Sequence, residues 1–279
     1  MIRLFKFFNK KEREYIEKEP HNIISNFDDF TKVTSYIYQK SGIIGLDKRA
    51  LTTSKLQQYA RDKNVYTTAD FLKTMQNSSD FYQDVINIAT VNETFFLREL
   101  KELQWLVKHI EKSNRPLKIL SIPSSSGEEI YSILLLLYEN NIDTKDIFFN
   151  GYDINSYTIS CAIRGEYNDY SLHKLDKSMK DKYFNKIEDK QYKISSTLQN
   201  NTNFQQKNIF DIEEGEEQYD IILSRNMFIY FDTKNCIKAL DIIISLLKTD
   251  GIYIKGHADY IQPHPELHNI VFGIYEKKV

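Results

Sequence analysis

The 279-residue sequence predicts a protein of the α/β class, in which helices cover a parallel sheet that follows a small helical bundle. Two observations carry this prediction. Helical periodicity dominates about the first 90 residues, and from Leu117 onward short runs rich in β-branched residues alternate with helical stretches. The composition agrees, because 41% hydrophobic and 27% charged residues with a net charge of −2 are typical of an ordinary globular protein.

The N-terminal part contains four predicted helices. The first has an apolar face marked by Phe30, Val33 and Ile37 and is expected to end at Gly42. The other three are expected to begin near Asp47, Thr68 and Ser79. We therefore expect residues 1–90 to form a helical domain together with the start of a linker.

This helical part carries an excess of positive charge. Between Thr31 and Met75 there are eight Lys and Arg residues against three Asp. A solvated bundle surface explains the excess. The alternative is a docking face for an acidic partner, since like charges on one side of a protein steer association.

The second part alternates strands and helices. Its predicted strands are LKILSIP, IFFNGYDI, YDIILS, GIYIKG and a closing pair within NIVFGIYEK. The order strand, helix, strand is typical of a parallel sheet with helices on both faces, and the closing pair has the pattern of an added hairpin. The polar segment Asp189–Asn203 interrupts the alternation and is expected to form a small antiparallel insert.

The glycine pattern excludes two common classes of nucleotide-binding protein. No two of the nine glycines are separated by a single residue, so a GxGxxG loop is absent. No glycine is followed by Lys and then Ser or Thr. A dinucleotide oxidoreductase of the usual fingerprint and a Walker loop are therefore excluded.

The cysteines and the apolar runs indicate a reducing compartment. Cys161 and Cys236 lie apart from each other and from any His cluster, which argues against a disulfide framework or a zinc ribbon. His264 and His268 are flanked by prolines and have no third ligand, so no metal site is expected. The longest apolar run, Ile133–Leu137, cannot span a bilayer, and the N-terminus lacks a signal-peptide pattern. A cytoplasmic protein is expected.

Ligands of open α/β sheets bind at the carboxyl ends of the strands, and polar motifs follow two of the predicted strands. Ser121–Glu129 (SIPSSSGEE) brings Glu128 and Glu129 to the first turn of a helix. Two carboxylates there disfavour a phosphate and favour hydroxyls, amines or a cationic group, although plain helix capping is the alternative. Asp153, after the next strand, is either a turn residue or an acceptor for two ribose hydroxyls.

Two further motifs add polar groups near the same strand ends. Arg225 and Asn226 follow the strand YDIILS and need partners if they are buried. Upstream, VNETFFLRE supplies Asn92, Thr94 and Arg98, and the planar guanidinium of Arg98 suits a carboxylate. A cap followed by a surface arginine is the alternative for this segment. Together the motifs indicate a nucleoside ligand without a phosphate chain, of which S-adenosylmethionine is the commonest.

The order of the motifs VNETFFLRE, PSSSGEEIYSI, GYDIN, RNMFIYF and LLKTDGIYIKGH closely resembles the CheR-type chemoreceptor methyltransferases. That family transfers methyl groups from S-adenosylmethionine to glutamates of chemotaxis receptors. The resemblance extends from about Asp28 to the C-terminus. It implies a Rossmann-like class I methyltransferase domain at 91–279, a helical domain at 1–90 and a small antiparallel β insert at 189–203.

The resemblance also implies site residues and partners. The implied cofactor contacts are Asn92, Thr94, Arg98, Glu128, Asp153, Asn208, Ile209, Arg225 and Asn226. Arg98 and Tyr230 match residues that the family places near the reacting centre, so they are the expected catalytic residues. S-adenosylhomocysteine would be the product. The implied partners are cytoplasmic helices of chemoreceptors, so the membrane would be reached only through the receptor.

The sequence departs from the family pattern at three places. The helix that is usually rich in arginine reads KLQQYARDK, the stretch GHSE reads GHAD at Gly256–Asp259, and the insert is short. In some relatives that insert grips the C-terminal tail of a receptor.

Two alternatives stay open beside receptor methylation. One is a methyltransferase with another substrate. DNA is disfavoured because Arg225–Phe228 lacks the two prolines of the adenine-methylating motif and the net charge of −2 does not suit a duplex binder. No nucleic-acid partner is therefore expected. The other alternative is a signalling module that binds the cofactor or a receptor without transferring a methyl group.

Overall fold

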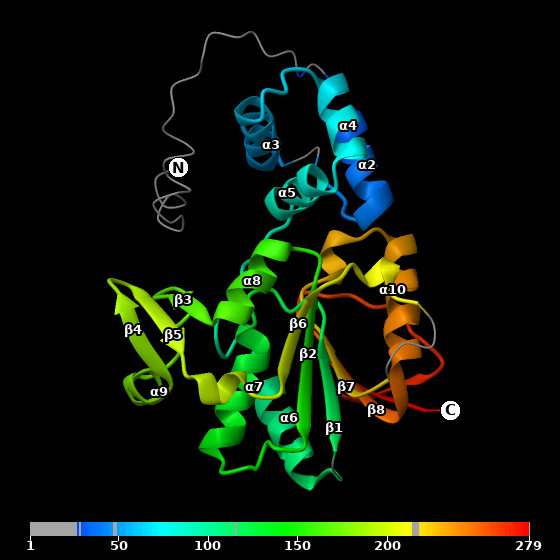
Figure 1. Ribbon diagram of the computed structural model, residues 1–279. Coiled ribbons are helices and arrows are strands. Elements are labelled where there is room, and N and C mark those ends of the chain that lie inside the picture. The colour runs from blue at the N-terminus through cyan, green and yellow to red at the C-terminus, as the bar shows by residue number, and fades with distance from the viewer. Residues whose placement is uncertain (1–26, 28, 47–48, 115, 214–217, 279) are drawn as a thin grey trace.

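The computed structural model describes residues 27, 29–46, 49–114, 116–213 and 218–278. A bundle of four helices lies over one end of a larger α/β part, and a small sheet projects from the side of that part (Figure 1). Among the described residues, no helix combines the length and apolar character that crossing a bilayer requires. The expectation on the signal-peptide pattern of the N-terminus lies outside the described residues.

The bundle contains the four expected helices. They are α2 (Thr31–Ser41), α3 (Ala50–Asp62), α4 (Thr68–Asn77) and α5 (Ser79–Ala89). Polar caps set two of their starts, since the side chains of Thr67 and Ser78 accept hydrogen bonds from backbone N–H groups in the first turns of α4 and α5. Val33, Ile37 and Phe71 are fully buried in the core that the four helices share.

A seven-stranded sheet forms the centre of the α/β part. Its strand order is β6-β2-β1-β7-β8-β10-β9. The strands are β1 (Leu117–Ser121), β2 (Ile147–Asp153), β6 (Thr202–Gln206), β7 (Tyr219–Ser224), β8 (Leu247–Lys255), β9 (Leu267–Val271) and β10 (Ile274–Lys277). The first five in spatial order are parallel, and β10 pairs antiparallel with β8 and β9 as the expected hairpin. The predicted α/β class is confirmed.

Helices cover both faces of this sheet. They are α6 (Leu100–Lys112), α7 (Glu128–Glu139) and α8 (Ser156–Arg164) on one face and α10 (Thr233–Leu246) on the other (Figure 1). Ile119 and Leu223 point to the first face, while Leu120 and Ile222 point to the second, and all four are buried. Burial on both faces explains why the strands read as continuous apolar runs.

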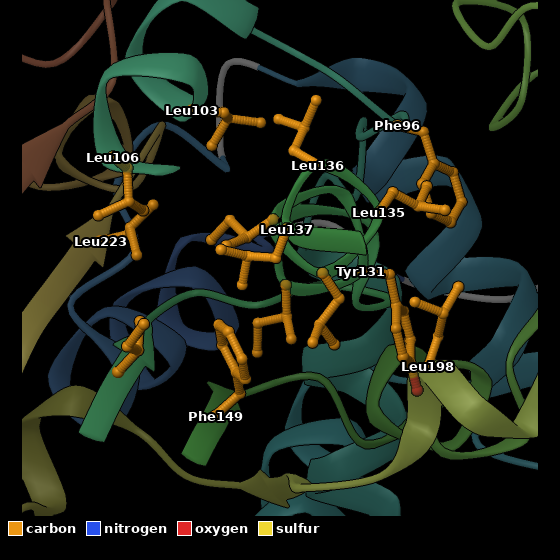
Figure 2. Packing of buried hydrophobic residues seen from close by; sticks show 14 of the residues in the cluster. Phe96, Leu103, Leu106, Tyr131, Leu135, Leu136, Leu137, Phe149, Leu198 and Leu223 are labelled. Atoms are coloured by element: carbon orange, nitrogen blue, oxygen red, sulfur yellow. The ribbon is translucent and has the colours of Figure 1, made fainter. Parts of the chain in front are cut away.

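The first core is built around α7. Its residues Ile130–Leu137 are buried throughout, and Leu137 packs with Phe149 of β2 and Leu223 of β7 in the same cluster (Figure 2). Leu103 and Leu106 of α6 complete this layer. The apolar run that is too short for a membrane span is therefore the centre of the core.

The small antiparallel sheet is present, but its limits differ from those expected. It consists of β3 (Glu166–Asn168), β5 (Gln191–Ile194) and β4 (Phe184–Glu188) in spatial order, with α9 (Lys177–Tyr183) before β4. The expected range 189–203 misses β3 and all of β4 and includes the start of β6, which pairs with β2 in the main sheet. The strands of the insert are too short to show alternation, and β6 has the polar composition of an exposed edge strand.

Hydrogen bonds fix the helical bundle at the carboxyl ends of the parallel strands. The Tyr38 hydroxyl donates to Asp232 Oδ2 at 2.6 Å, and the Ile44 N–H donates to the Tyr230 carbonyl at 2.9 Å. Gln83 Nε2 donates to the Ile154 carbonyl, also at 2.9 Å. Because Ile154 follows β2 and Tyr230 follows β7, the bundle covers the edge where an α/β sheet binds ligands.

A pair of glycines before α3 tests this junction. Gly42 and Gly45 both have a left-handed backbone, with φ values of 73° and 72°. A Cβ on Gly42 would lie 2.5 Å from Phe210 Cε2, whereas a Cβ on Gly45 would meet nothing within 4 Å. Gly45→Ala should therefore cost only about 1–2 kcal/mol of backbone strain. Gly42→Ala should add about 1–3 kcal/mol for overpacking at the junction.

Urea unfolding of the two variants measures this difference. Equal losses of unfolding free energy in both would contradict the close contact between Gly42 and Phe210.

Candidate active site

A cavity of about 230 Å³ opens between the helical bundle and the carboxyl ends of the parallel strands. Its walls come from both parts of the chain. The bundle contributes Ser41, Ile43 and Arg49; the link contributes Val91–Phe95 and Arg98; the strand ends contribute Ile122–Ser125, Asp153, Ile154, Lys207, Ile209, Arg225–Met227 and Ile229–Phe231. Segments distant in the sequence thus meet in one space.

Most of the residues predicted for the site line this cavity. They are Asn92, Thr94, Arg98, Asp153, Ile209, Arg225, Asn226 and Tyr230. Asn208 and Glu128 do not line it. The Asn208 side chain accepts from the Phe210 N–H at 3.2 Å and donates to the Lys40 carbonyl at 2.9 Å. Asn208 therefore holds a turn and the domain junction.

Glu128 lies beneath the serine loop, residues 124–126. It is 1% exposed and accepts hydrogen bonds from the hydroxyls of Ser126 at 2.7 Å and Ser171 at 3.2 Å. Burial raises the pKa of Glu128, while these hydrogen bonds oppose the shift. In this structure the neighbouring Glu129, which sequence analysis did not single out as a ligand residue, is the one that reaches the cavity.

Asp153 organises the serine loop from the end of β2. Its Oδ2 accepts from the Ser125 N–H and its Oδ1 from the Asn155 N–H, both at 2.8 Å. Burial raises the pKa of Asp153 to about 6, against the effect of these two hydrogen bonds. The carboxylate lines the cavity and keeps lone pairs for further donors, as a pair of ribose hydroxyls requires.

The serine loop presents unused hydroxyl groups to the same space. The Oγ atoms of Ser124 and Ser125 are buried and have no hydrogen-bond partner in the described part of the chain. Both residues line the cavity. Because buried polar groups are nearly always hydrogen-bonded, these two hydroxyls indicate a site for a polar ligand.

Arg225 forms a buried ion cluster at the floor of the cavity. Its Nη1 lies 2.6 Å from Glu129 Oε2, and its Nε lies 3.1 Å from Glu99 Oε2. It also donates to the Arg98 carbonyl, and its side chain is 4% exposed. The guanidinium is therefore bound by protein groups, which was not expected for a residue predicted to contact the cofactor.

The loop after β7 depends on Asp259, which sequence analysis noted only as a departure from the family pattern. Its carboxylate accepts hydrogen bonds from the N–H groups of Asn226, Phe228 and Gly256. Asp259 is 3% exposed, and burial raises the pKa of its carboxyl. The bonds hold Asn226 in a left-handed conformation with φ of 60°.

Glu99, Glu102 and His257 form a second polar cluster. One ligand atom of each lies within 4.8 Å of the others, and His257 Nε2 is 2.7 Å from Glu102 Oε1. Glu99 is paired with Arg225, so the cluster continues the ion network below the cavity. Sequence analysis did not find it because Glu102 and His257 are 155 residues apart. The absence of a metal stays a prediction.

The fold and the cavity define an α/β protein with a ligand site at the carboxyl ends of its parallel strands. Residues 92–275 match the family described as "CheR methyltransferase, SAM binding domain". The chain therefore belongs to the CheR methyltransferase family, and its cofactor is S-adenosylmethionine, as expected.

Curated relatives extend the match to most of the chain. A "Chemotaxis protein methyltransferase" of Campylobacter jejuni is 34% identical, with 90% of this chain and 95% of that protein covered. "Chemotaxis protein methyltransferase 2" of Vibrio cholerae is 31% identical, with coverages of 86% and 88%. A "Chemotaxis protein methyltransferase" of Borreliella burgdorferi is 26% identical, with coverages of 92% and 96%.

The residues of the cavity fit S-adenosylmethionine. Asp153 can accept from the ribose hydroxyls, and the unpaired hydroxyls of Ser124 and Ser125 can bind its polar groups. The carboxylate of Asp153 also gives this side of the cavity negative charge, which a sulfonium cation tolerates, whereas Glu129 is paired with Arg225.

Asp153→Asn should weaken the binding of S-adenosylhomocysteine about 10- to 100-fold, because a charged acceptor is lost. The affinity of the unchanged protein should also fall below pH 6. The pKa of Asp153 is raised to about 6, so below this pH its carboxylate is replaced by a neutral carboxyl group, which is a weaker hydrogen-bond acceptor. Binding at pH 5 should be about tenfold weaker than at pH 7.

Calorimetric titration at both pH values tests this assignment. The affinity of Asp153→Asn should change little between them. An unaltered affinity of the variant at pH 7 would disprove the ribose assignment.

Arg225→Met should lower the free energy of unfolding by about 3–5 kcal/mol, because Glu99 and Glu129 would be left buried without a counter-charge. Arg164→Met is the matched control. It removes the ion pair between Arg164 and Glu166, whose side chains are 47% and 36% exposed respectively. The free energy of unfolding should fall by less than about 1 kcal/mol. Urea unfolding measures the free energy of unfolding of both variants. Similar losses in the two would contradict a large contribution of the Arg225 cluster to stability.

Proposed function

We propose that this protein methylates glutamate side chains of chemoreceptors and so sets receptor adaptation in bacterial chemotaxis. The methyl donor is S-adenosylmethionine and the product S-adenosylhomocysteine. One observation carries the proposal. Arg98 and Tyr230, a cation and a hydroxyl suited to a carboxylate, line the same cavity as Asp153 and the serine loop. The names of the relatives support chemotaxis as the setting.

The reaction needs little acid or base catalysis. A glutamate with an ordinary pKa of about 4.3 is ionised at neutral pH and is already a nucleophile. S-adenosylmethionine supplies the methyl group, whose bond to sulfur breaks as its bond to the carboxylate oxygen forms. The contribution of the protein is then mainly to hold the two reactants in line and to exclude water.

Tyr230 and Arg98 are the proposed catalytic residues. Burial raises the pKa of Tyr230, so its hydroxyl stays protonated and can donate to the substrate carboxylate. Arg98 is held in place by a hydrogen bond from Nη1 to the Glu93 carbonyl at 2.6 Å. The remaining N–H groups of its guanidinium are suited to a second carboxylate oxygen.

The division of the chain belongs to the same proposal. We place the boundary between the helical and the methyltransferase domain near residue 90, just after α5 ends at Ala89. The positive excess of the helical domain would dock on acidic receptor helices, and high salt would weaken that contact. Such a partner places the protein in the cytoplasm.

Transfer of a labelled methyl group to cytoplasmic receptor fragments tests the proposal. The label should be released by alkali, as a methyl ester is, and should be lost when the methyl-accepting glutamates are changed to glutamine. Arg98→Ala and Tyr230→Phe should lower the rate about 10- to 100-fold because they misplace the carboxylate.

S-adenosylhomocysteine binding is the control in these variants. Binding of this product without any labelling of receptor fragments would favour a non-catalytic signalling module. Labelling that survives the glutamate-to-glutamine changes would favour another substrate.

A further inference from the structure

We propose that Arg49 of the helical domain forms a subsite for the carboxylate that receives the methyl group. The inference rests on the proposed function, because it names a residue that binds the substrate carboxylate of that reaction. In the sequence, Arg49 is one of the eight basic residues between Thr31 and Met75. Arg49 directly precedes α3 and lines the cavity together with Ser41 and Ile43 of the same domain.

Arg49 lies beside the proposed catalytic tyrosine. Its guanidinium carbon is 5.4 Å from the centre of the Tyr230 ring, within the range of a cation–π contact. The backbone joins the same two segments, since the Ile44 N–H donates to the Tyr230 carbonyl at 2.9 Å. The position of Arg49 is therefore set by the domain junction.

One nitrogen of this guanidinium lacks a partner. Nη1 of Arg49 is buried from solvent and makes no hydrogen bond within the described part of the chain. A desolvated cationic N–H group without an acceptor is costly. An anionic ligand in the cavity would supply that acceptor.

The carboxylates around the cavity are engaged elsewhere. Glu129 is paired with Arg225, Asp153 accepts from two backbone N–H groups, and Glu93 accepts from the Tyr170 hydroxyl at 3.1 Å. None of these acids pairs with Arg49. Within the described part of the chain no acid is paired with Arg49, so an anionic ligand in the cavity is the acceptor that we infer for it.

The charges of the cavity separate into two sides. Asp153 stands on the side of the serine loop together with Glu129, which Arg225 neutralises. Arg49 and Arg98 both act on Tyr230, where their charges partly oppose the rise in its pKa that burial causes and that Glu93 and Asp259 add to. A sulfonium cation belongs near the acidic side and an ionised glutamate near the basic side. The guanidinium fork matches a carboxylate with two parallel hydrogen bonds.

Arg49→Gln and Arg49→Lys test the subsite. The substrate is a receptor fragment that contains the methyl-accepting glutamates. Arg49→Gln should lower kcat/KM about 100-fold, and the kcat/KM of Arg49→Lys should lie between that of Arg49→Gln and that of the unchanged protein. The affinity for S-adenosylhomocysteine should stay within about twofold in both. Arg164→Gln, which changes an exposed arginine of α8 outside the cavity, should leave all these values unchanged.

A second measurement separates recognition of the carboxylate from structural damage. In the presence of S-adenosylhomocysteine, the unchanged protein should bind the glutamate fragment more tightly than the same fragment with glutamine at the methylation sites. Arg49→Gln should bind the two fragments equally. Urea unfolding of Arg49→Gln confirms that the variant is folded.

The outcomes distinguish this inference from the proposed function. If Arg49→Gln methylates the fragment at the normal rate and keeps its preference for glutamate, the subsite is wrong while the proposed function stands. If S-adenosylhomocysteine binding weakens as much as kcat/KM, Arg49 binds the carboxylate of the cofactor, which also overturns the inference. If the unchanged protein methylates no glutamate fragment, the proposed function fails and the subsite with it.

Discussion

The site depends on the ion cluster around Arg225. Its guanidinium binds Glu129 at the start of α7 and, just before α6, both Glu99 and the carbonyl of Arg98. Two segments thus converge on the segment after β7 that carries Arg225. Each ion would be costly to bury alone, and only this arrangement pairs all of them. The same three segments carry the serine loop, Arg98 and the turn after β7. The walls of the cavity are therefore positioned from below by a single charged network.

Two carboxylates extend this principle to the loops above. Asp153 holds Ser125 and Asp259 holds Asn226, and both of these loop residues have a left-handed backbone, with φ of 47° and 60°. A non-glycine residue pays about 1–2 kcal/mol for that conformation. Hydrogen bonds from backbone N–H groups to a buried carboxylate offset the cost. Glycines complete the two turns. Gly127 closes the first with φ of 89°, and a Cβ on Gly256 would lie 2.6 Å from the Asn226 backbone nitrogen in the second.

The sequence predicts the fold better than it predicts contacts. Apolar runs and their spacing identify four of the five parallel strands. They miss β6, because its polar composition is that of an edge strand, and they do not separate the helix α6 from the link before it. The place of Asp153 at a strand end predicts its position in the wall of the cavity, while its ribose contact stays a prediction. The roles of Glu129 and Arg49 depend on partners more than 90 residues away, which no local pattern contains. Asp259 depends on backbone groups of the turn after β7, which are 31 and 33 residues away. In a count of charges Arg49 was one of eight basic residues.

The position of the cavity explains why the helical domain is more than a docking platform. The bundle closes the strand ends through Tyr38, Ile44 and Gln83, and its Arg49 stands against the ring of Tyr230. The acidic side of the cavity comes entirely from the methyltransferase domain, whereas its basic side is divided between the two domains. A cationic cofactor can therefore be recognised by the larger domain alone. An anionic acceptor is fully recognised only where both domains meet, which links methyl transfer to the assembled junction.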